Sequence, residues 1–326
     1  MRIYYCIVAT IIAWGTIGCD SSDDTASEIE KGEYRQEMRE LVIGISRTAK
    51  ATRADFAIIP QNGIELITQN GEPDGILAES YLAAIDAHGQ EDLFFGYDND
   101  NVATPSEASN YLKAFLDRSK TEGKKILVTD YCNNPDKIAV SYQLNAAKGY
   151  TSYAAPERNL NAIPGTAPRE ESEAIITHLG QVKNFLYLIN PENYNSKAAY
   201  ITAVTSTNYD LLIMDLFFND EAFTAAEVNQ LRLKANGGRR MVICYMSIGE
   251  AENYRYYWDP SWNTTKPDWI VAENPDWPGN YKVQYWNETW QALLYKNPDS
   301  YLNKIMSSGY DGVYLDIIDA FEYFEN

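Results

Sequence analysis

Apolar and polar residues beyond position 33 alternate between two kinds of segment. Near-continuous apolar runs at 54–63, 124–132 and 239–250 predict buried strands. Segments such as 33–52 and 105–123 instead place apolar residues every three or four positions, with charges on the opposite side, and this spacing predicts helices. Buried strands that alternate with amphipathic helices are typical of a parallel sheet covered by helices.

We predict eight major strands, three before and five after a connector around residues 161–182 that contains Pro and Gly. The strands are 54–63, 83–96, 124–132, 183–190, 209–218, 239–250, 282–286 and 310–316, with a further short strand at 150–155. The helices are 33–52, 105–123, 134–149, 196–207, 224–238 and 287–309. Eight strand–helix units in 326 residues fit an α/β fold of the (β/α)₈ TIM-barrel type, and a doubly wound open sheet is the alternative.

The N-terminus has the pattern of a targeting segment. Arg2 precedes an apolar run at 3–18 that is short for a membrane-spanning helix, and small residues precede Cys19. We interpret 1–18 as a signal peptide and Cys19 as the lipid anchor of a bacterial cell-envelope protein, either periplasmic or on the cell surface. Cleavage of a plain signal peptide nearby is the alternative. The acidic stretch 19–33 predicts a disordered tether.

Charge and cysteine content narrow the range of partners. The formal net charge of −19 argues against nucleic acid and anionic lipid, so we expect membrane contact through the lipid anchor only, and it suits a cationic ligand. Cys132 and Cys244 lie beside predicted strands, and we favour buried free thiols there over a disulfide. The chain has only two His residues and no CxxC motif, so we expect no metal and no cofactor.

Six stretches of the chain resemble glycoside hydrolase family 114. They are YMSIGEAENYRYYW, NPDWPGNYKVQYW and GYDGVYLDIIDAFEYFE near the C-terminus, and IIPQNG, GQEDLFF and GKKILVTDY near the N-terminus. The family includes endo-α-1,4-polygalactosaminidases. The resemblance therefore implies a TIM barrel and hydrolysis of an α-1,4-linked galactosamine or N-acetylgalactosamine polysaccharide. A tRNA synthetase, the label once given to such proteins, is disfavoured because no HIGH-like or KMSK-like motif is present.

The order of these stretches differs from that of the family. Residues 34 to about 160 resemble family strands 6–8, and residues 182–326 resemble family strands 1–5. We interpret this order as a circular permutation of one domain at 34–326, in which the connector joins the ancestral termini. A closed barrel places its first and last strands side by side, so such a joint is physically possible. The alternative is a truncated family domain behind an unrelated N-terminal domain.

The catalytic pair implied by the resemblance falls on Asp316 and Glu91, each at the end of a predicted strand. The resemblance favours retention, with Asp316 as the nucleophile and Glu91 as the acid/base. Two strands that are two positions apart allow either the ~5 Å carboxyl separation of a retaining enzyme or the ~6.5–9.5 Å of an inverting one. Asp92 beside Glu91 is expected to raise the pKa of Glu91. Without the resemblance, Glu91 would read as a surface acid and Asp316 as a helix N-cap.

Other polar and aromatic residues near predicted strand ends are candidate substrate ligands. They are Asp215, Asn62, Asp130, Glu250, Glu252, Tyr254, Trp258 and Asp319. Asn62 is expected to contact a sugar hydroxyl or to fix a carboxylate. Capping roles remain open for Glu250, Glu252 and Asp319, as does packing for the aromatic residues of 251–281. We expect a monomer that binds galactosamine-rich polysaccharide; the alternative function is a non-catalytic carbohydrate-binding lipoprotein.

Overall fold

The computed structural model describes residues 33–326 and contains two parallel sheets. The larger sheet has five strands, in the spatial order β1 (Ala57–Pro60), β13 (Gly312–Asp316), β9 (Met241–Ser247), β6 (Leu211–Met214) and β5 (Phe185–Tyr187). The smaller sheet has the order β2 (Ala87–Glu91), β3 (Lys125–Tyr131) and β4 (Thr151–Ala155). Nearly every residue of these eight strands is buried, as expected for parallel strands covered on both faces. The predicted α/β class is therefore confirmed.

The two parallel sheets touch at both edges. One parallel bridge joins Gln61, which follows β1, to Gly89 in β2. At the other edge β4 lies next to β5, where the rings of Tyr153 and Phe185 have centroids 5.6 Å apart. The chain therefore carries four parallel strands before the connector and four after it, and neighbours are found at the outer edges of both sheets.

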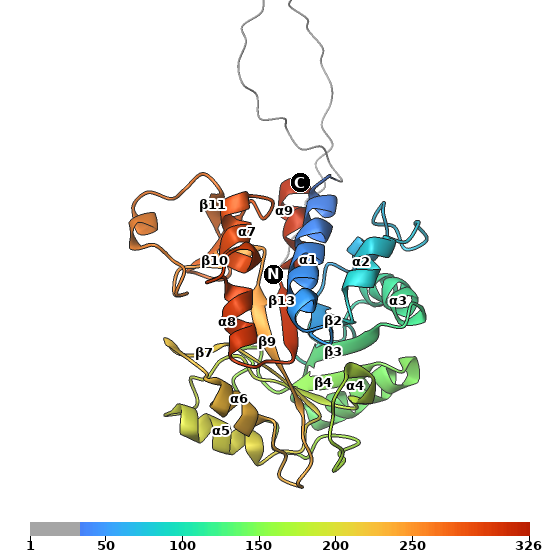
Figure 1. Ribbon diagram of the computed structural model, residues 1–326. Helices are drawn as coiled ribbons and strands as arrows, with labels where there is room; N and C mark the ends of the chain where they lie inside the picture. The colour runs from blue at the N-terminus through green and yellow to red at the C-terminus, as the bar shows by residue number, and fades with distance from the viewer. Residues whose placement is uncertain (1–32) are drawn as a thin grey trace, which may run out of the picture.

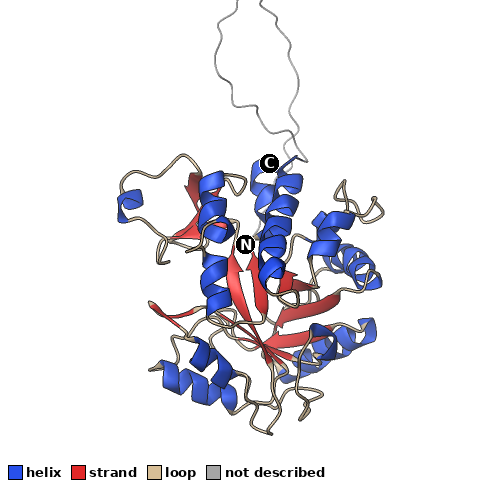
Figure 2. Cartoon of the chain, viewed as in Figure 1, coloured by secondary structure: helices blue, strands red, loops and turns tan. Residues whose placement is uncertain are grey.

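Helices surround the strands (Figures 1 and 2). They are α1 (Glu33–Thr52), α2 (Glu79–Ala84), α3 (Ser106–Thr121), α4 (Pro135–Lys148), α5 (Lys197–Thr205), α6 (Ala225–Leu231), α7 (Glu288–Gln291), α8 (Tyr301–Ser307) and α9 (Phe321–Glu325). Local sequence sets several boundaries: the Asn134 side chain caps the start of α4, and Gly149 ends that helix in the left-handed conformation. The apolar side of α1 is fully buried at Met38, Leu41 and Ile45.

The two ends of the described chain lie side by side. Figure 1 shows α1 next to α9. An ion pair of 2.9 Å joins Arg35 of α1 to Glu325 of α9, and the rings of Tyr34 and Phe324 stack with centroids 5.5 Å apart. The chain after Asp316 therefore ends against the helix that precedes β1.

The predicted division into three strands before the connector and five after it is wrong. Residues 282–286 do not form a parallel strand: β12 (Asn280–Val283) pairs antiparallel with β10 (Glu250–Glu252) and β11 (Ile270–Glu273) in a separate small sheet. Alternate residues of β12 are buried, which is the pattern of a strand with one face toward the core and one face toward solvent. The short segment at 150–155 is instead the full parallel strand β4.

Two predicted helices are shorter than expected. The segment 287–309 breaks at Asn297, which is extended (φ −93°, ψ 153°) because Pro298 follows it; a π-helical turn η4 (Ala292–Lys296) lies before the break and α8 after it. The segment 224–238 is helical only as far as Leu231, since Leu233 then forms an antiparallel bridge with Arg239. The remaining elements are 3₁₀ turns η1 (Ile64–Ile67), η2 (Leu179–Gln181), η3 (Pro260–Asn263) and η5 (Ile318–Ala320), and the hairpin β7 (Phe217–Phe218) with β8 (Glu221–Ala222).

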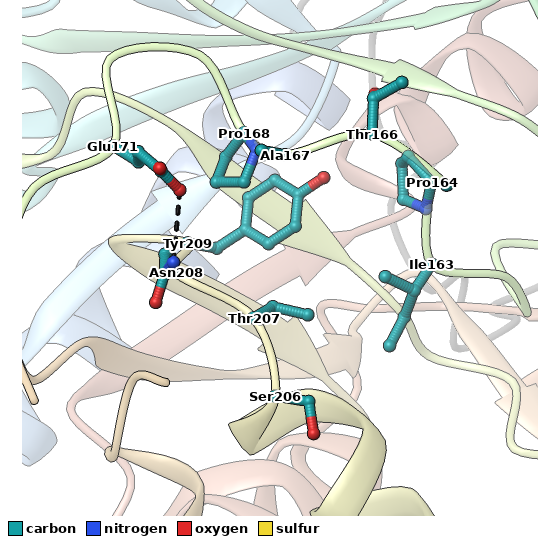
Figure 3. Close-up of a pocket in the computed structure, with 11 residues that line it drawn as sticks. Ile163, Pro164, Thr166, Ala167, Pro168, Glu171, Ser206, Thr207, Asn208 and Tyr209 are labelled. Atoms are coloured by element: carbon teal, nitrogen blue, oxygen red, sulfur yellow. Dashed lines mark hydrogen bonds between the residues drawn. The ribbon is translucent and has the colours of Figure 1, made fainter. Parts of the chain in front are cut away.

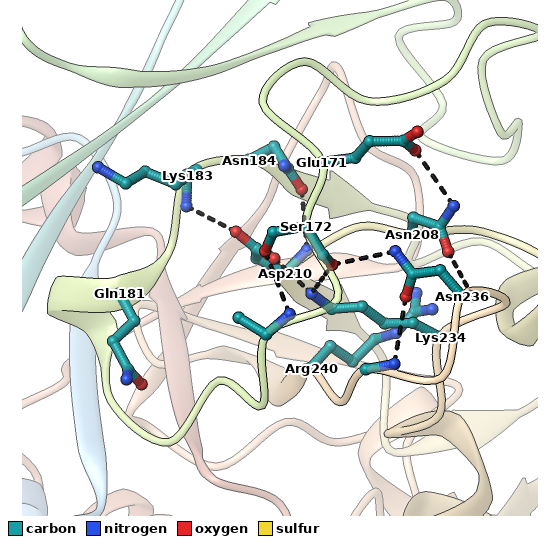
Figure 4. Close-up of polar contacts among 12 residues, drawn as sticks. Glu171, Ser172, Gln181, Lys183, Asn184, Asn208, Asp210, Lys234, Asn236 and Arg240 are labelled. Atoms are coloured by element: carbon teal, nitrogen blue, oxygen red, sulfur yellow. Dashed lines mark hydrogen bonds and ion pairs between the residues drawn. The ribbon is translucent and has the colours of Figure 1, made fainter.

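The predicted connector is mostly irregular and is fixed by polar contacts. A pocket lies where it passes the segment before β6; Pro164, Pro168 and Tyr209 help to line it (Figure 3). Farther along, the ammonium of Lys234 donates to the Ser172 carbonyl at 3.0 Å and pairs with Asp210 at 2.6 Å (Figure 4). None of the predicted site residues lines this pocket.

The predicted signal peptide, Cys19 and the tether as far as residue 32 lie outside the described residues, whereas Glu33 begins α1. Within 33–326, no helix combines the length and the apolar character needed to cross a membrane.

Candidate active site

The carboxyl ends of β1, β2 and β13 meet, and each presents one polar side chain. These are Gln61 directly after β1, Glu91 at the end of β2 and Asp316 at the end of β13. The backbone ties the three ends together, because the Gln61 N–H donates to the Leu315 carbonyl at 2.8 Å and the Asn62 N–H donates to the Gly89 carbonyl at 2.9 Å. Glu91 and Asp316 therefore stand on either side of β1, two strands apart as the sequence predicts.

A left-handed residue follows each of these three positions. Asn62 has φ 60°, Asp92 has φ 56° and Ile317 has φ 59°. Asn and Asp tolerate this conformation, but a β-branched residue there is a real outlier with a cost of about 1–3 kcal/mol. The sharp turn at Ile317 places backbone strain directly beside the Asp316 carboxyl, which is the kind of place where such strain clusters in active sites.

The amide of Gln61 bridges the two candidate catalytic carboxyls. Its Nε2 donates to Oε2 of Glu91 at 2.9 Å and to Oδ1 of Asp316 at 2.9 Å. Two oxygens that share one nitrogen at this distance lie less than twice that distance apart. Such a separation is shorter than the ~6.5–9.5 Å of inverting glycosidases and compatible with the ~5–5.5 Å of retaining ones.

Further donors hold each carboxyl in place. Oε1 of Glu91 accepts from the Tyr131 hydroxyl, and its Oε2 also accepts from Asn62 Nδ2 at 3.2 Å. Oδ2 of Asp316 accepts from the Tyr245 hydroxyl at 2.7 Å. Of the two roles expected for Asn62, the structure thus shows the contact that fixes a carboxylate. The Asn62 side-chain oxygen also accepts from the Glu91 N–H at 3.1 Å.

Both carboxyls have raised pKa values, for related reasons. Burial raises the pKa of Glu91, and the charge of Asp92 raises it further, in the direction the sequence predicts. Burial, followed by repulsion from an ionised Glu91, raises the pKa of Asp316 to about 7. That repulsion disappears when Glu91 carries a proton, and Asp316 then keeps the hydrogen bond from Tyr245. Two carboxyls this close titrate as a pair, so one shared proton near neutral pH is expected.

Asp215 and Glu252 are engaged by a buried arginine. Arg255 makes a bidentate pair with Asp215, at 2.8 and 2.7 Å, and its Nε donates to Oε2 of Glu252. Oε1 of Glu252 also accepts from the Tyr254 hydroxyl at 2.7 Å. Both predicted substrate ligands are thus held within the protein. Through Arg255 they join the end of β6 to β10.

Asp130 lies inside the protein rather than at the surface of the site. It is fully buried, and its Oδ1 accepts from the backbone N–H groups of Phe94 and Phe95 at 2.8 and 3.2 Å. Its Oδ2 accepts from Ser141 at 2.6 Å and Asn145 at 3.0 Å. These contacts fasten the loop after β2, and so the backbone beyond Glu91, to the middle and second half of α4.

Glu250 and Asp319 differ in their surroundings: Glu250 is held by hydrogen bonds, and Asp319 acts through its charge. Oε1 of Glu250 accepts from Asn274 at 2.8 Å and Lys282 at 3.4 Å, while its Oε2 is buried without a hydrogen-bond partner. Burial raises the pKa of Glu250. Asp319, in η5, contributes charge that raises the pKa values of both Glu250 and Asp316. Asp319 thus acts on Asp316 directly, whereas Glu250 is linked to Asp319.

The two aromatic candidates differ in exposure. Trp258 is 9% exposed and packs between Trp262 and Tyr281, with ring centroids at 5.3 and 5.0 Å, so its faces are occupied by protein. Tyr254 is 57% exposed and Trp277, which we did not select from the sequence, is 54% exposed. The turns that carry these two residues adjoin, since the Asn253 N–H donates to the Gly279 carbonyl at 2.8 Å.

Sequence reasoning missed the residues that organise the pair. Gln61, Tyr131, Tyr187 and Tyr245 all contact the carboxyls or the bridging amide. The position of Gln61 in the IIPQNG stretch was an available signal, because it is one of the polar residues at the end of the strand predicted at 54–63. No comparable signal marked the tyrosines, which read as ordinary buried strand residues.

The cysteines and other potential metal ligands of residues 33–326 form neither a metal-binding cluster nor a disulfide. This part of the chain contains no group of three or more His, Cys, Asp or Glu side chains arranged to hold a metal ion. Cys132 and Cys244 are buried free thiols, as favoured from the sequence. The groups that the structure places at the site are two coupled carboxyls and their neutral hydrogen-bond donors.

Part of the chain is similar to known proteins. An uncharacterized protein from Deinococcus radiodurans is 40% identical over 127 residues, which is 39% of this chain and 38% of the relative. Uncharacterized proteins from Methanocaldococcus jannaschii (38% identical over 133 residues, 40% of this chain) and Thermotoga maritima (33% identical over 130 residues, 40% of this chain) are also similar. The chain spans 36% and 39% of the length of these two relatives. Residues 166–326, which include Asp316 but not Glu91, match the model of glycoside-hydrolase family GH114, and this match supports a glycosidase in general.

Proposed function

We propose that the protein hydrolyses an α-1,4-linked galactosamine or N-acetylgalactosamine polysaccharide by a retaining two-carboxylate mechanism. The observation that carries the proposal is the hydrogen bonding of Glu91 and Asp316 to one Gln61 amide nitrogen. Glu91 lies outside the residues that match the family, yet the fold brings it beside Asp316, which lies within them. An isolated strand-end acid is commonly a cap, whereas two partly buried acids that share a donor are poised for coupled proton chemistry.

The catalytic roles of Glu91 and Asp316 follow from the state in which the two carboxyls together hold one proton. Glu91 in its protonated form donates a proton to the glycosidic oxygen as the bond to the anomeric carbon breaks. The Asp316 carboxylate attacks that carbon and forms a glycosyl ester, and the leaving sugar departs as a neutral alcohol. Glu91, now ionised, takes a proton from water; the water oxygen attacks the anomeric carbon, and the bond to Asp316 breaks. The pair returns to its starting protonation.

The arrangement of strands supports a permuted (β/α)₈ barrel as the frame for this chemistry. Eight parallel strands with contacts at the outer edges of both sheets fit one closed ring, in which β4 and β5 are joined by the connector. The family match begins at residue 166, within that connector, and runs to the last residue. We therefore propose that β5, β6, β9 and β13 correspond to the first half of the family fold and that β1 to β4 supply its second half.

The substrate assignment rests on charge and on exposed rings. A formal charge of −19 favours a polymer with free amines. Tyr254 and Trp277 are exposed aromatic residues, and Arg255 lies over one face of the Tyr254 ring at 5.3 Å. Sugar rings stack on such exposed rings, and ammonium groups gain cation–π attraction there. We further propose lipid anchoring through Cys19 in the bacterial cell envelope, which would hold a monomeric enzyme near such a polysaccharide.

The test is hydrolysis of purified acetylated and de-N-acetylated galactosaminan, with products identified by mass and anomeric configuration by NMR. We expect oligosaccharide release with retention, and a loss of about 10³-fold or more in kcat for Asp316→Asn and Glu91→Gln with polymer binding preserved. Asp299→Asn, at an exposed carboxylate, is the matched control. Wild-type protein that binds both polymers but never cleaves either would refute the enzyme and favour the non-catalytic carbohydrate-binding protein.

A further inference from the structure

Gln61 is a buried side chain whose polar atoms all face the site. It is 3% exposed, and it directly follows β1, the strand that separates Glu91 from Asp316. Its nitrogen serves both carboxyls at 2.9 Å, and its oxygen accepts from the Tyr187 hydroxyl at 3.1 Å. Both N–H groups of the amide are used by the two candidate catalytic carboxyls, so its nitrogen has no donor left for a substrate.

The orientation of this amide is determined by its neighbours. A reversed amide would point its carbonyl oxygen at the oxygens of Glu91 and Asp316, and would lose two hydrogen bonds to ionisable groups. Tyr187 reinforces the observed orientation because its hydroxyl donates to the Gln61 oxygen. Tyr187 is itself held rigidly: it is 1% exposed, and its ring packs edge-on against Tyr314 with centroids 5.2 Å apart.

We propose that Gln61 is a positioning residue that holds Glu91 and Asp316 at their separation, with Tyr187 fixing the orientation of its amide. This inference rests on the proposed function of the pair. Gln61 touches the two reacting carboxyls and acts through them, and Tyr187 acts through Gln61.

A neutral donor is suited to this position for an electrostatic reason. An ammonium or guanidinium between the two carboxyls would stabilise both as anions and remove the proton that the acid must supply. Without any donor, the two oxygens would repel each other and separate. An amide offers one N–H to each carboxyl without a full positive charge, so the carboxyls stay close while one proton is retained.

The surrounding titratable groups belong to several elements. Those that contribute to the environment of the pair are Asp92, Tyr131, Arg158, Tyr187, Tyr245, Tyr314 and Asp319. Arg158 is the one cation of this set, and it is engaged by Asp92 at 3.3 Å and Asp100 at 2.8 Å. Arg158 is thus occupied by other acids, and Gln61 is the residue that donates a hydrogen bond to both carboxyls.

Gln61→Met tests the proposal, because methionine keeps the length of the side chain but has no N–H group. We expect kcat on the cleaved polymer to fall about 10²-fold with KM changed less than about threefold, and the acid limb of the pH–rate profile to move to higher pH. Tyr187→Phe should give the same pattern with a smaller loss, about five- to tenfold. The matched control is Gln291→Met, which removes a buried glutamine of α7 that contacts Tyr285 and Tyr295.

A readout independent of activity is the pH dependence of the melting temperature. The pair has raised pKa values in the folded protein, so the folded state binds more protons than the unfolded state and stability falls as pH rises from about 4 to about 7. In Gln61→Met this fall should extend to higher pH. Unchanged kcat and an unchanged stability profile in Gln61→Met would overturn the proposal, as would equal effects in Gln291→Met. A wild-type protein without hydrolase activity whose Gln61→Met variant still shifts the stability profile would instead refute the proposed function alone.

Discussion

The ion pair of Lys234 with Asp210 gives a sharp prediction about how the connector is held. Both side chains are fully buried, with Nζ and Oδ1 2.6 Å apart. The ammonium also donates to the Ser172 carbonyl in the connector, and Oδ2 of Asp210 accepts from the Lys183 N–H at 2.9 Å, just before β5. One pair thus fastens the connector to the amino ends of β5 and β6.

Lys234→Met removes the charge and keeps most of the side-chain volume. Asp210 is then left buried with a backbone donor but no directly paired cation, although Arg240 remains within its electrostatic reach, and the Ser172 carbonyl loses its ammonium partner. Breaking a buried pair from one side costs about 3–5 kcal/mol. For a domain of this size we expect a fall in melting temperature of about 6–10 °C.

The assays are urea unfolding for the free energy and thermal unfolding for the melting temperature, both followed by circular dichroism, with Lys296→Met as the control. Lys296 pairs with Glu288 at 2.6 Å, but the two side chains are 34% and 82% exposed, so its loss should change stability by less than about 1 kcal/mol. The double variant Asp210→Asn/Lys234→Met should recover at least about 1 kcal/mol relative to Lys234→Met, because no buried charge remains unpaired. A cost of less than about 1 kcal/mol for Lys234→Met, or no recovery in the double variant, would refute the reasoning.

Three further predictions concern the site and its surroundings. The raised pKa of Asp316 (about 7) means that folding disfavours its ionised form. Asp316→Asn should therefore be more stable than the wild type at pH 8, by about 1 kcal/mol after allowance for the remaining solvent contact of the side chain, but should gain no stability at pH 5. Chemical denaturation at both pH values measures this difference. Burial lowers the pKa of His88 to about 3, so below pH 6.5 the unfolded state binds a proton that the folded state does not, and stability is lost as pH falls. In His88→Phe the loss of stability between pH 7 and pH 4 should be smaller by about 3 kcal/mol than in the wild type. Equal losses in the two proteins would contradict this prediction. Alanine at Tyr254 or Trp277 should raise the KM for polymer about five- to tenfold, whereas Tyr111→Ala on α3, where the ring is 41% exposed, should not; calorimetric binding to the polymer checks the same difference.

The family resemblance singled out Glu91 and Asp316 in the sequence, and the geometry of parallel strands explains why two acids so far apart in the chain can meet. Parallel strands end on one side of a sheet, so acids that directly follow buried strands gather there. Glu91 and Asp316 follow this rule and meet. Asp130 and Asp215 follow it as well, but their donors come from α4, the loop after β2 and Arg255, and spacing along the chain does not reveal such partners.

Local patterning therefore determined the α/β class, most strands and the helices at 33–52, 105–123 and 134–149, because burial and helical period are written into neighbouring residues. Tertiary structure decided what depends on distant pairing. In the folded chain β12 pairs antiparallel in a separate sheet, and β4 pairs parallel with β3. Gln61, which is 255 positions from Asp316 in the chain, lies between the two carboxyls. Hydrogen bonds are short-ranged and directional, so the partners of a buried polar group are fixed only when the chain has folded.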